Sequence, residues 1–493
     1  MEQIPFHPRK EPEFPGPLSW DALTNIYEGN ADFGQRTIRP AGEEGRCIRL
    51  CWLEGRVKSE RLSDYVFEPL LREFLPPEEN WLELLQKEVL WNQSPTVCKD
   101  LDQAAYALLD GACLLFVKEG VLLCMVPTED RRSVGKPENE SNLKGAKDSF
   151  VEAIRVNTSL IRSRLKTPRL RIKRQLVGRQ TRTTVEMLWI EGLCDPEYPA
   201  QIGLRLQDIQ EDGLLTTSEL EEYLIDPRSS AFPRMLFTER PDRVCRGLLE
   251  GRVALLVDGI PLSCVLPGDM SMFLQAPQDR SDHWAAATAL TALRYLCMGV
   301  TLLLPGLYIS IAEFHFELIP TKLAMSIIAS KQDVPFPTAL EVIGLLIAFE
   351  ILQEAGLRLP NTIGQTVSII GGLVVGQAAV DAKIVSPVVV IIVAVSGIAG
   401  FTMPNQDFSN ALRLWRFFLT VLAALMGIFG LTIGVAALVC HLAGLEEYGL
   451  PYLVSFTGPN GYQKENHPIY RKPVPEVKYR VAYLRPKNRR RRR

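Results

Sequence analysis

An uncharged stretch between Leu359 and Asp381 constrains this chain more than any other feature. A helix needs about 20 apolar residues to cross a bilayer, and this stretch is long enough. Small residues recur at every fourth position and share one helix face: Gly364, Ser368, Gly372 and Gly376. Such faces let helices pack closely in lipid. The stretch is therefore either a packing helix of a membrane bundle, or a packing helix that also lines a polar path.

The polar-path interpretation depends on two side-chain amides near the ends of the stretch, Gln365 and Gln377. Amide oxygens and closely packed glycines can together line a narrow pore. The candidate residues for pore lining or packing are Gln365, Ser368, Gly372 and Gly376.

The rest of the chain divides sharply by charge. Most charged residues lie in 1–283, whereas the long apolar runs lie in 295–445. We predict an α/β soluble N-terminal region of two α/β subdomains, followed by an all-α polytopic transmembrane domain. The N-terminus is polar and rich in proline, without the apolar core of a signal peptide, so we expect the soluble region to stay in the cytoplasm.

Composition shifts and turn residues set the expected boundaries. These are a flexible lead-in (1–30), a first cytoplasmic subdomain (31–135), a linker (136–150), a second cytoplasmic subdomain (151–283), a transmembrane helical domain (284–447) and a basic tail (448–493). Apolar runs around Gly residues predict strand pairs in 112–126, 168–194 and 252–267. Both subdomains place helices before a closing hairpin, but their sequences are too different to indicate a repeat.

Five apolar segments could cross the membrane: 295–312, 338–356, 360–381, 384–404 and 417–445. A cytoplasmic soluble region and an arginine-rich tail on the same side require an even number of crossings. The second segment carries three acidic candidates for membrane depth: Glu341, Glu350 and Glu354. Because carboxylates are costly at the bilayer centre, we expect this segment to be interfacial, re-entrant or protein-facing. The fifth is longer than the hydrocarbon core, so it should tilt or kink.

Two stretches are strongly basic although the net charge is only −2. Residues 155–182 lack the aromatic platforms of a nucleic-acid site, so we expect a solvated or subunit-facing surface, with anionic lipid as the alternative. The tail from Arg471 to Arg493 has eleven Lys or Arg and one acidic residue, Glu476.

Nothing in the sequence indicates an enzyme, a cofactor or a metal. Phosphate-binding Gly-rich loops, HExxH pairs and GxSxG elbows are absent, and the five histidines lack metal-ligand spacing. The ten cysteines are scattered, and in a cytoplasmic domain we expect them to be reduced and mostly buried.

Long stretches of the chain resemble the A subunit of the GerA-type spore germinant receptors. The resembling stretches are 150–170, 239–267, 302–327, 334–387 and 449–453. The departures are residues before 140, KGAKDSF (144–150) and the five terminal arginines. The resemblance implies a protein of the spore inner membrane that works with a transporter-like B subunit, which binds the germinant, and a lipoprotein C subunit. It also implies that the A subunit oligomerises into a channel.

Two functions therefore remain open. The first is a germinant-gated ion channel subunit, in which Glu341, Glu350 and Glu354 form acidic rings at the pore mouths; the alternative for these residues is an interface facing water or a partner's arginine. The second is a non-conducting scaffold or signal relay that couples the germinant-binding partner to ion release elsewhere.

Overall fold

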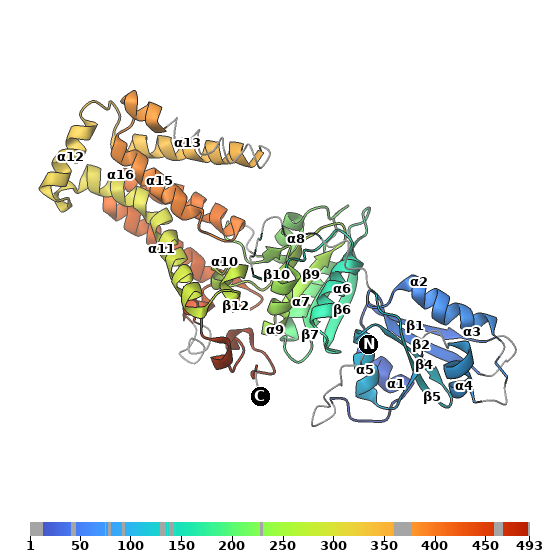
Figure 1. Cartoon of the computed structure of the whole chain (residues 1–493). Helices are drawn as coiled ribbons and strands as arrows, with labels where there is room; N and C mark the ends of the chain where they lie inside the picture. Colours follow the sequence, from blue (N-terminus) through green and yellow to red (C-terminus); the bar gives the residue numbers. More distant parts are fainter. Residues whose placement is uncertain are drawn as a thin grey trace. The chain divides into compact units, whose positions relative to one another are not determined.

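The computed structural model describes residues 13–40, 46–73, 75–76, 80–90, 94–128, 135, 137, 140, 142, 144–226, 230–358, 376–457 and 467–491. It separates into two compact units (Figure 1). Unit 1 comprises 1–225, 237–267 and 479–493, and unit 2 comprises 226–236 and 268–478. The two units are described separately below.

The first half of unit 1 is a five-stranded antiparallel sheet with helices on both faces. Its elements are α1 (Trp20–Tyr27), β1 (Phe33–Ile38), β2 (Ile48–Leu53), α2 (Ser59–Leu62), η1 (Ser63–Phe67), α3 (Glu68–Arg72), α4 (Trp81–Leu84), η2 (Leu85–Val89), β3 (Thr96–Cys98), α5 (Leu101–Leu109), β4 (Ala112–Val117) and β5 (Gly120–Met125). The strand order is β1-β2-β4-β5-β3.

Strand β4 shows why this sheet needs helices on both faces. Cys113 and Leu115 pack into the core under α2, α3 and α4, whereas Leu114 and Phe116 pack into the core with α1 and α5. Successive side chains of a strand point to opposite faces, so an unbroken apolar run indicates a strand covered on both sides.

The second half of unit 1 repeats this plan element by element. It consists of α6 (Ile154–Arg164), β6 (Leu170–Val177), β7 (Thr183–Ile190), α7 (Glu197–Gln207), α8 (Thr217–Leu224), β8 (Leu236–Thr238), α9 (Pro241–Glu250), β9 (Val253–Val257) and β10 (Ser263–Leu266). Its sheet order, β6-β7-β9-β10-β8, is that of the first sheet. The two halves are thus structural duplicates, which their sequences do not reveal.

Buried polar contacts join the two halves. Arg162 on α6 forms a two-point ion pair with Asp32, with Nε–Oδ2 and Nη2–Oδ1 distances of 2.8 and 3.0 Å, and both side chains are buried. Next to this pair, the Ala31 amide donates to the Ile172 carbonyl at 2.8 Å. The Ile172 amide in turn donates to Asn30 Oδ1 at 2.9 Å.

The three predicted strand pairs are confirmed, since β4–β5, β6–β7 and β9–β10 are antiparallel. The lead-in differs from the expectation, because Trp20–Tyr27 forms α1 and buries Leu23 and Tyr27 in the core. The N-cap of α8 is Thr216, which forms a capping box with Glu219.

The cysteines are free thiols, as expected, and seven of the ten are buried. Burial raises the pKa of Cys124 and of Cys194 to about 12. Buried thiols of this kind are structural rather than reactive.

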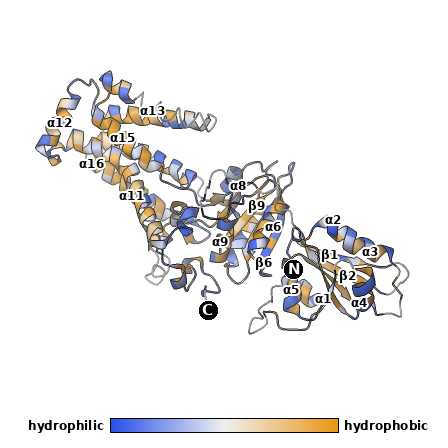
Figure 2. Cartoon of the chain, in the orientation of Figure 1, coloured by the Kyte–Doolittle hydropathy of each residue, from blue (hydrophilic) through white to orange (hydrophobic). Residues whose placement is uncertain are grey.

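Unit 2 is largely helical. Its elements are α10 (Met270–Leu274), η4 (Pro277–Arg280), α11 (Trp284–Ile309), η5 (Ser310–Phe314), η6 (Phe316–Leu318), α12 (Thr321–Lys331), α13 (Thr338–Arg358), a helical stretch at 376–381, α15 (Pro387–Gly400), α16 (Gln406–Gly444), β11 (Glu446–Glu447), β12 (Leu450–Pro451), α17 (Val454–Thr457) and η7 (Val474–Glu476). Apolar residues dominate α11, α13, α15 and α16 (Figure 2).

Helix α16 reverses direction at Gly427, where the backbone is non-helical with φ 61° and ψ −141°. The rings of Trp415 and His441 lie 5.4 Å apart, although a straight helix would separate them by roughly 40 Å. A Cβ on Gly434 would lie 2.5 Å from Leu419, on the preceding arm. The predicted kink is therefore a complete turn, and 406–444 forms a helical hairpin.

The reversal requires glycine for two reasons. Its positive φ is unfavourable for other residues, and a Cβ would lie 2.8 Å from the ring of Phe314. Phe314 follows α11, so the end of α11 meets the turn of the α16 hairpin. We call this end of unit 2 the tip.

The opposite end of unit 2, where α11 begins, is called the base. There Arg294 pairs with Asp279 of η4 at 2.5 Å, and the rings of Tyr295 and Phe456 lie 5.8 Å apart. Strand pair β11–β12 directly follows α16, and the amide of Tyr452 donates to the Leu445 carbonyl. The first arm of the hairpin therefore begins on the base side, and the second arm ends there.

Candidate functional site

Two helical stretches in the described part of the chain are long and apolar enough to cross a membrane: Trp284–Phe314 and Gln406–Gly444. Pro387–Gly400 is a shorter apolar helix. Polar groups within this bundle are the candidate functional residues, because charge at membrane depth is costly and rarely retained without a role.

The predicted small-residue stripe lies mostly outside the described residues. Gln365, Ser368 and Gly372 fall there, and only Gly376 can be placed. Gly376 is buried, and a Cβ on it would make an ordinary 3.5 Å contact with Val390 of α15. This position therefore packs against a neighbouring helix, and its role in a pore remains a prediction.

Glu341 lies near the start of α13, and its side chain is buried. Its Oε2 accepts a hydrogen bond from the Ser386 amide at 2.7 Å, and Lys331 Nζ lies 3.7 Å from Oε1. Nearby, Glu313 Oε1 accepts from the Ala339 amide at 2.9 Å. These carboxylates hold α12, α13 and α15 together at the tip.

Glu350 lies nine residues, about two and a half turns, further along α13 and meets two arginines of α16. Arg416 is hydrogen-bonded to Glu350 Oε1, and Arg413 Nη1 lies 3.7 Å from Oε2. Arg416 is buried, with 3% of its side chain exposed, whereas Glu350 is 37% exposed. Glu350 thus meets two arginines of its own chain. A single carboxylate against two guanidinium groups leaves a net positive charge in the bundle.

The sequence analysis missed Arg413 and Arg416 because it started the last segment at Phe417. The helix begins eleven residues earlier, at Gln406, where the Asn405 side chain accepts from the Phe408 amide. That cap was the available signal, since Asn is among the preferred N-cap residues. The third acidic candidate, Glu354, is exposed on α13, and its role remains a prediction.

Residues 226–236 lie between α8 and β8 in sequence but belong to unit 2. Phe232 contacts the rings of Phe408, Trp415, His441 and Tyr452, with centroids 5.8 to 6.4 Å away. Arg234 Nη1 lies 3.3 Å from Glu447 Oε2, and both side chains are buried. The loop is therefore anchored to both ends of the α16 hairpin, at the base.

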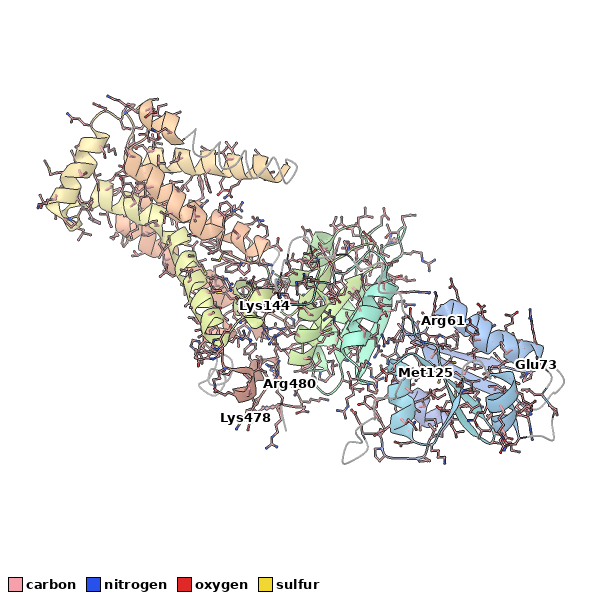
Figure 3. All side chains as sticks on the ribbon, in the orientation of Figure 1. Arg61, Glu73, Met125, Lys144, Lys478 and Arg480 are labelled. Carbon is pink, nitrogen blue, oxygen red and sulfur yellow. The ribbon has the colours of Figure 1, made fainter. Side chains whose placement is uncertain are left out.

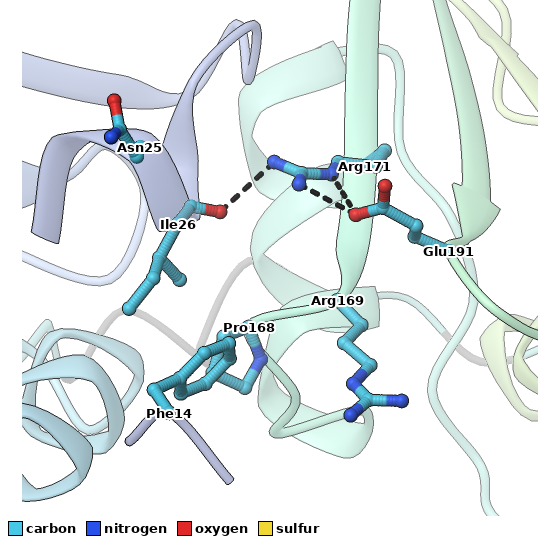
Figure 4. Close-up of a pocket in the computed structure, with 7 residues that line it drawn as sticks. All are labelled: Phe14, Asn25, Ile26, Pro168, Arg169, Arg171 and Glu191. Atoms are coloured by element: carbon cyan, nitrogen blue, oxygen red, sulfur yellow. Dashed lines mark hydrogen bonds and ion pairs between the residues drawn. The ribbon is translucent and has the colours of Figure 1, made fainter. Parts of the chain in front are cut away.

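A pocket of about 240 Å³ lies in unit 1 between its two halves (Figure 4). Its lining comprises Phe14, Asn25, Ile26, Pro168, Arg169, Arg171 and Glu191. Arg171 Nη1 donates to the Ile26 carbonyl at 2.9 Å, and its Nε and Nη2 bind Glu191 Oε2 at 2.8 and 2.6 Å. Arg169 Nε lies 2.7 Å from Glu13 Oε1. Both guanidinium groups already have carboxylate partners, so the pocket offers no uncompensated charge to a ligand.

The basic segment 155–182 differs from the expected solvated surface. Its paired residues are Arg162 with Asp32, Arg164 with Asp148, Lys166 with Asp110, Arg169 with Glu13, Arg171 with Glu191 and Arg174 with Glu186. Most of its charge is therefore neutralised within unit 1. Among the described residues, no group of three His, Cys, Asp or Glu could hold a metal ion.

Comparisons with known proteins agree on one family. The family described as Bacillus/Clostridium GerA spore germination protein matches residues 21–483. Spore germination protein GerLA of Bacillus cereus is 35% identical over 462 residues, which is 93% of both chains. Spore germination protein KA of Bacillus subtilis is 33% identical, over 90% of this chain and 83% of the relative.

Two further similarities concern a membrane protein and a solved structure. The uncharacterized membrane protein YfkQ of Bacillus subtilis is 38% identical, over 87% of this chain and 84% of its own. The crystal structure of the N-terminal domain of the A subunit of the Bacillus megaterium spore germinant receptor GerK3 aligns with 50% of this chain at 25% identity and a TM-score of 0.40.

Proposed function

We propose, because the chain belongs to the GerA family of Bacillus/Clostridium spore germination proteins, that it is the A subunit of a nutrient germinant receptor in the spore inner membrane. In this proposal it oligomerises with further copies of itself into a germinant-gated ion channel. A transporter-like B subunit binds the germinant, and a lipoprotein C subunit completes the receptor.

The contact of Glu350 with Arg413 and Arg416 carries the channel proposal. It lies between two helices of an apolar bundle, where an ion pair must outweigh a large desolvation cost. Intramembrane ionisable groups usually mark ion or substrate pathways. Glu350 is more than a third exposed in one chain, so the exposed part of its carboxylate can face a lumen between copies of the bundle.

The hairpin of α16 supports a consistent topology. The sequence predicts five candidate segments. Because the chain reverses direction at Gly427, the stretch 406–444 would cross the membrane twice, which brings the total to six crossings. Six crossings place the soluble region and the tail on the same side, as the positive-inside rule requires. No segment then has to be excluded, and α13 can span because Glu341 and Glu350 have cationic partners.

The topology is tested with reporters in intact membrane vesicles. A cysteine introduced at Gln332, in the tip loop, should label from the side opposite to a cysteine at Lys487, in the tail. Labelling of both positions from one side would contradict six crossings.

The channel is tested by reconstituting all three subunits in liposomes and measuring release of monovalent cations after adding germinant. We expect Gly372→Ala and Ser368→Ala to change the release rate or ion preference. Gly344→Ala serves as a control, because nothing lies within 4 Å of a Cβ there. No germinant-dependent release from the complete receptor would overturn the channel.

A relay remains the second candidate because the 226–236 loop joins the sequence of the α/β region to the hairpin base. In a relay, the Arg234–Glu447 pair transmits a signal without conduction. The relay would be supported if cation release required an additional channel protein and did not change in the Gly372 and Ser368 variants.

A further inference from the structure

The tail from Tyr479 to Arg491 is an ordered element of unit 1. Tyr479 and Arg490 form an antiparallel bridge, and the Arg480 amide donates to the Arg489 carbonyl at 2.8 Å. The Asn488 amide donates to the Gly192 carbonyl at 3.2 Å, and Leu484 is fully buried. The tail is therefore docked at two points, and its charges are held in place.

Five cations of this element are exposed: Arg485, Lys487, Arg489, Arg490 and Arg491. Within the described residues none of them has a carboxylate partner, and no acidic residue follows Glu476 in the sequence. Burial lowers the pKa of Arg480, and the positive charge of Arg491 lowers it further. Lys478 and Arg480 mark this part of the chain in Figure 3. An external anion would relieve this repulsion.

The chain just before this element is fixed to the base of unit 2. Arg471 binds three carbonyls of the segment that precedes α11, those of Asp279, Arg280 and Asp282. Its amide donates to Thr288 Oγ1 on α11 itself at 3.1 Å. Arg471 is thus held where the first apolar helix begins, and at most about 60 Å of extended chain leads from it to Arg489.

We propose that Arg485, Lys487 and Arg489–Arg491 form a binding surface for the anionic headgroups of the membrane in which the chain resides. Clusters of four to eight Lys or Arg close to a membrane helix attract anionic lipid by roughly 1 kcal/mol per charge. Lipid binding at this surface does not depend on channel activity, because a conducting subunit and a signal relay would both reside in the membrane.

Two observations favour lipid over nucleic acid. Exposed apolar and amphipathic side chains accompany the tail, with Val474, Tyr470 and Tyr479 being 72%, 41% and 43% exposed. Tyrosine is enriched at the membrane–water interface, and an exposed valine gains by entering it. In addition, Arg471, eight residues before Tyr479, is bonded to Thr288 of the first apolar helix, so the chain that leads into the tail departs from the base of the bundle.

The test uses the purified full-length chain in neutral detergent, titrated with phosphatidylglycerol or phosphatidylcholine and analysed by native mass spectrometry. We expect the wild type to retain phosphatidylglycerol preferentially and to lose the preference with added salt. The variant R489Q/R490Q/R491Q should bind phosphatidylglycerol about tenfold more weakly or worse. Replacing the same arginines with lysine should preserve binding, because the attraction depends on charge.

The matched control is K118Q/R179Q/R182Q, which removes three exposed cations from loops of unit 1. An equal loss in this control would show that only net charge matters and would overturn the assignment to the tail. Unchanged lipid retention in the tail variant would overturn it as well. Tighter binding of a short DNA duplex than of phosphatidylglycerol would assign the surface to nucleic acid instead. Cation release from liposomes is measured separately, so failure of this proposal leaves the channel test intact.

Discussion

The two arginine-rich stretches of this chain have similar composition but opposite surroundings. In 155–182 most of the cations meet carboxylates within unit 1, and Arg162 and Asp32 are both buried. In the tail, Arg485, Lys487 and Arg489–Arg491 are exposed and meet no carboxylate among the described residues. A run of basic residues therefore indicates a partner, and the fold decides whether that partner lies inside or outside the chain.

The apolar helical bundle of unit 2 adds an intermediate case. Arg413 and Arg416 share one carboxylate, Glu350, so their charge is only partly compensated. The three cases differ in how much each arginine depends on an intramolecular partner. Removing a charge should accordingly cost most stability at Arg162, less at Glu350 and Arg171, and almost none in the tail.

The largest effect is expected at Arg162. Arg162→Ala leaves Asp32 buried without its partner, which should lower the free energy of opening of unit 1 by about 3–5 kcal/mol. Hydrogen exchange of β6 and α6 in the full-length chain measures this. Asp32→Asn should show a similar loss, and the double variant should cost less than the sum of the two. Additive losses would show that the pair does not couple the halves.

A smaller effect is expected from Glu350→Gln. This change leaves the buried Arg416 next to Arg413 without a carboxylate. Because water reaches the Glu350 site, the unfolding free energy should fall by about 2 kcal/mol, less than for a fully buried unpaired charge. Thermal unfolding of the detergent-solubilised chain measures it. Glu317→Gln, at an exposed position of η6, serves as a control and should unfold within a degree or two of wild type. Equal destabilisation of both variants would contradict a specific pairing.

Local patterns in the sequence predicted the local parts of this structure. The hairpins β4–β5, β6–β7 and β9–β10 were found because apolar runs and turn residues lie next to each other in the chain. Edge strand β1 was missed because Gln35–Thr37 are exposed, which removes the apolar signal. The duplication of the two halves was missed because strand order is a property of pairing between distant segments, which residue identity does not record.

Non-local partners explain the remaining errors at the candidate site. The reversal at Gly427 lies inside an apolar run, where one more glycine carries little information, and only the contact of Trp415 with His441 reveals it. Likewise, Asp32 is far in sequence from the arginine that it neutralises. The sequence drew attention to Glu341 and Glu350 of α13 but not to their cationic partners, because those partners lie on α12 and α16.

Removing the charge of Arg171 should lower the free energy of opening of unit 1 by about 1 kcal/mol. It joins the halves of unit 1 through the Ile26 and Glu28 carbonyls, pairs with Glu191 within its own half, and has 20% of its side chain exposed. Arg171→Gln should speed hydrogen exchange in α1 and β6 about fivefold, in line with that loss. Arg155→Gln is the control, since Arg155 is 72% exposed and 4.0 Å from Glu54. Faster exchange in both variants would mean that net charge, not this contact, joins the halves.

The smallest effect on stability is expected from R489Q/R490Q/R491Q. These side chains are exposed and have no carboxylate partner among the described residues, so their loss should change the unfolding free energy by less than about 0.5 kcal/mol. Relief of like-charge repulsion around Arg480 should make any change slightly stabilising. Thermal unfolding in neutral detergent measures this, and added phosphatidylglycerol should raise the unfolding temperature of wild type more than that of the variant. A large destabilisation of this variant in neutral detergent would show that the tail arginines, like Arg162, have a partner within the chain. That result would contradict the difference drawn between the two arginine-rich stretches.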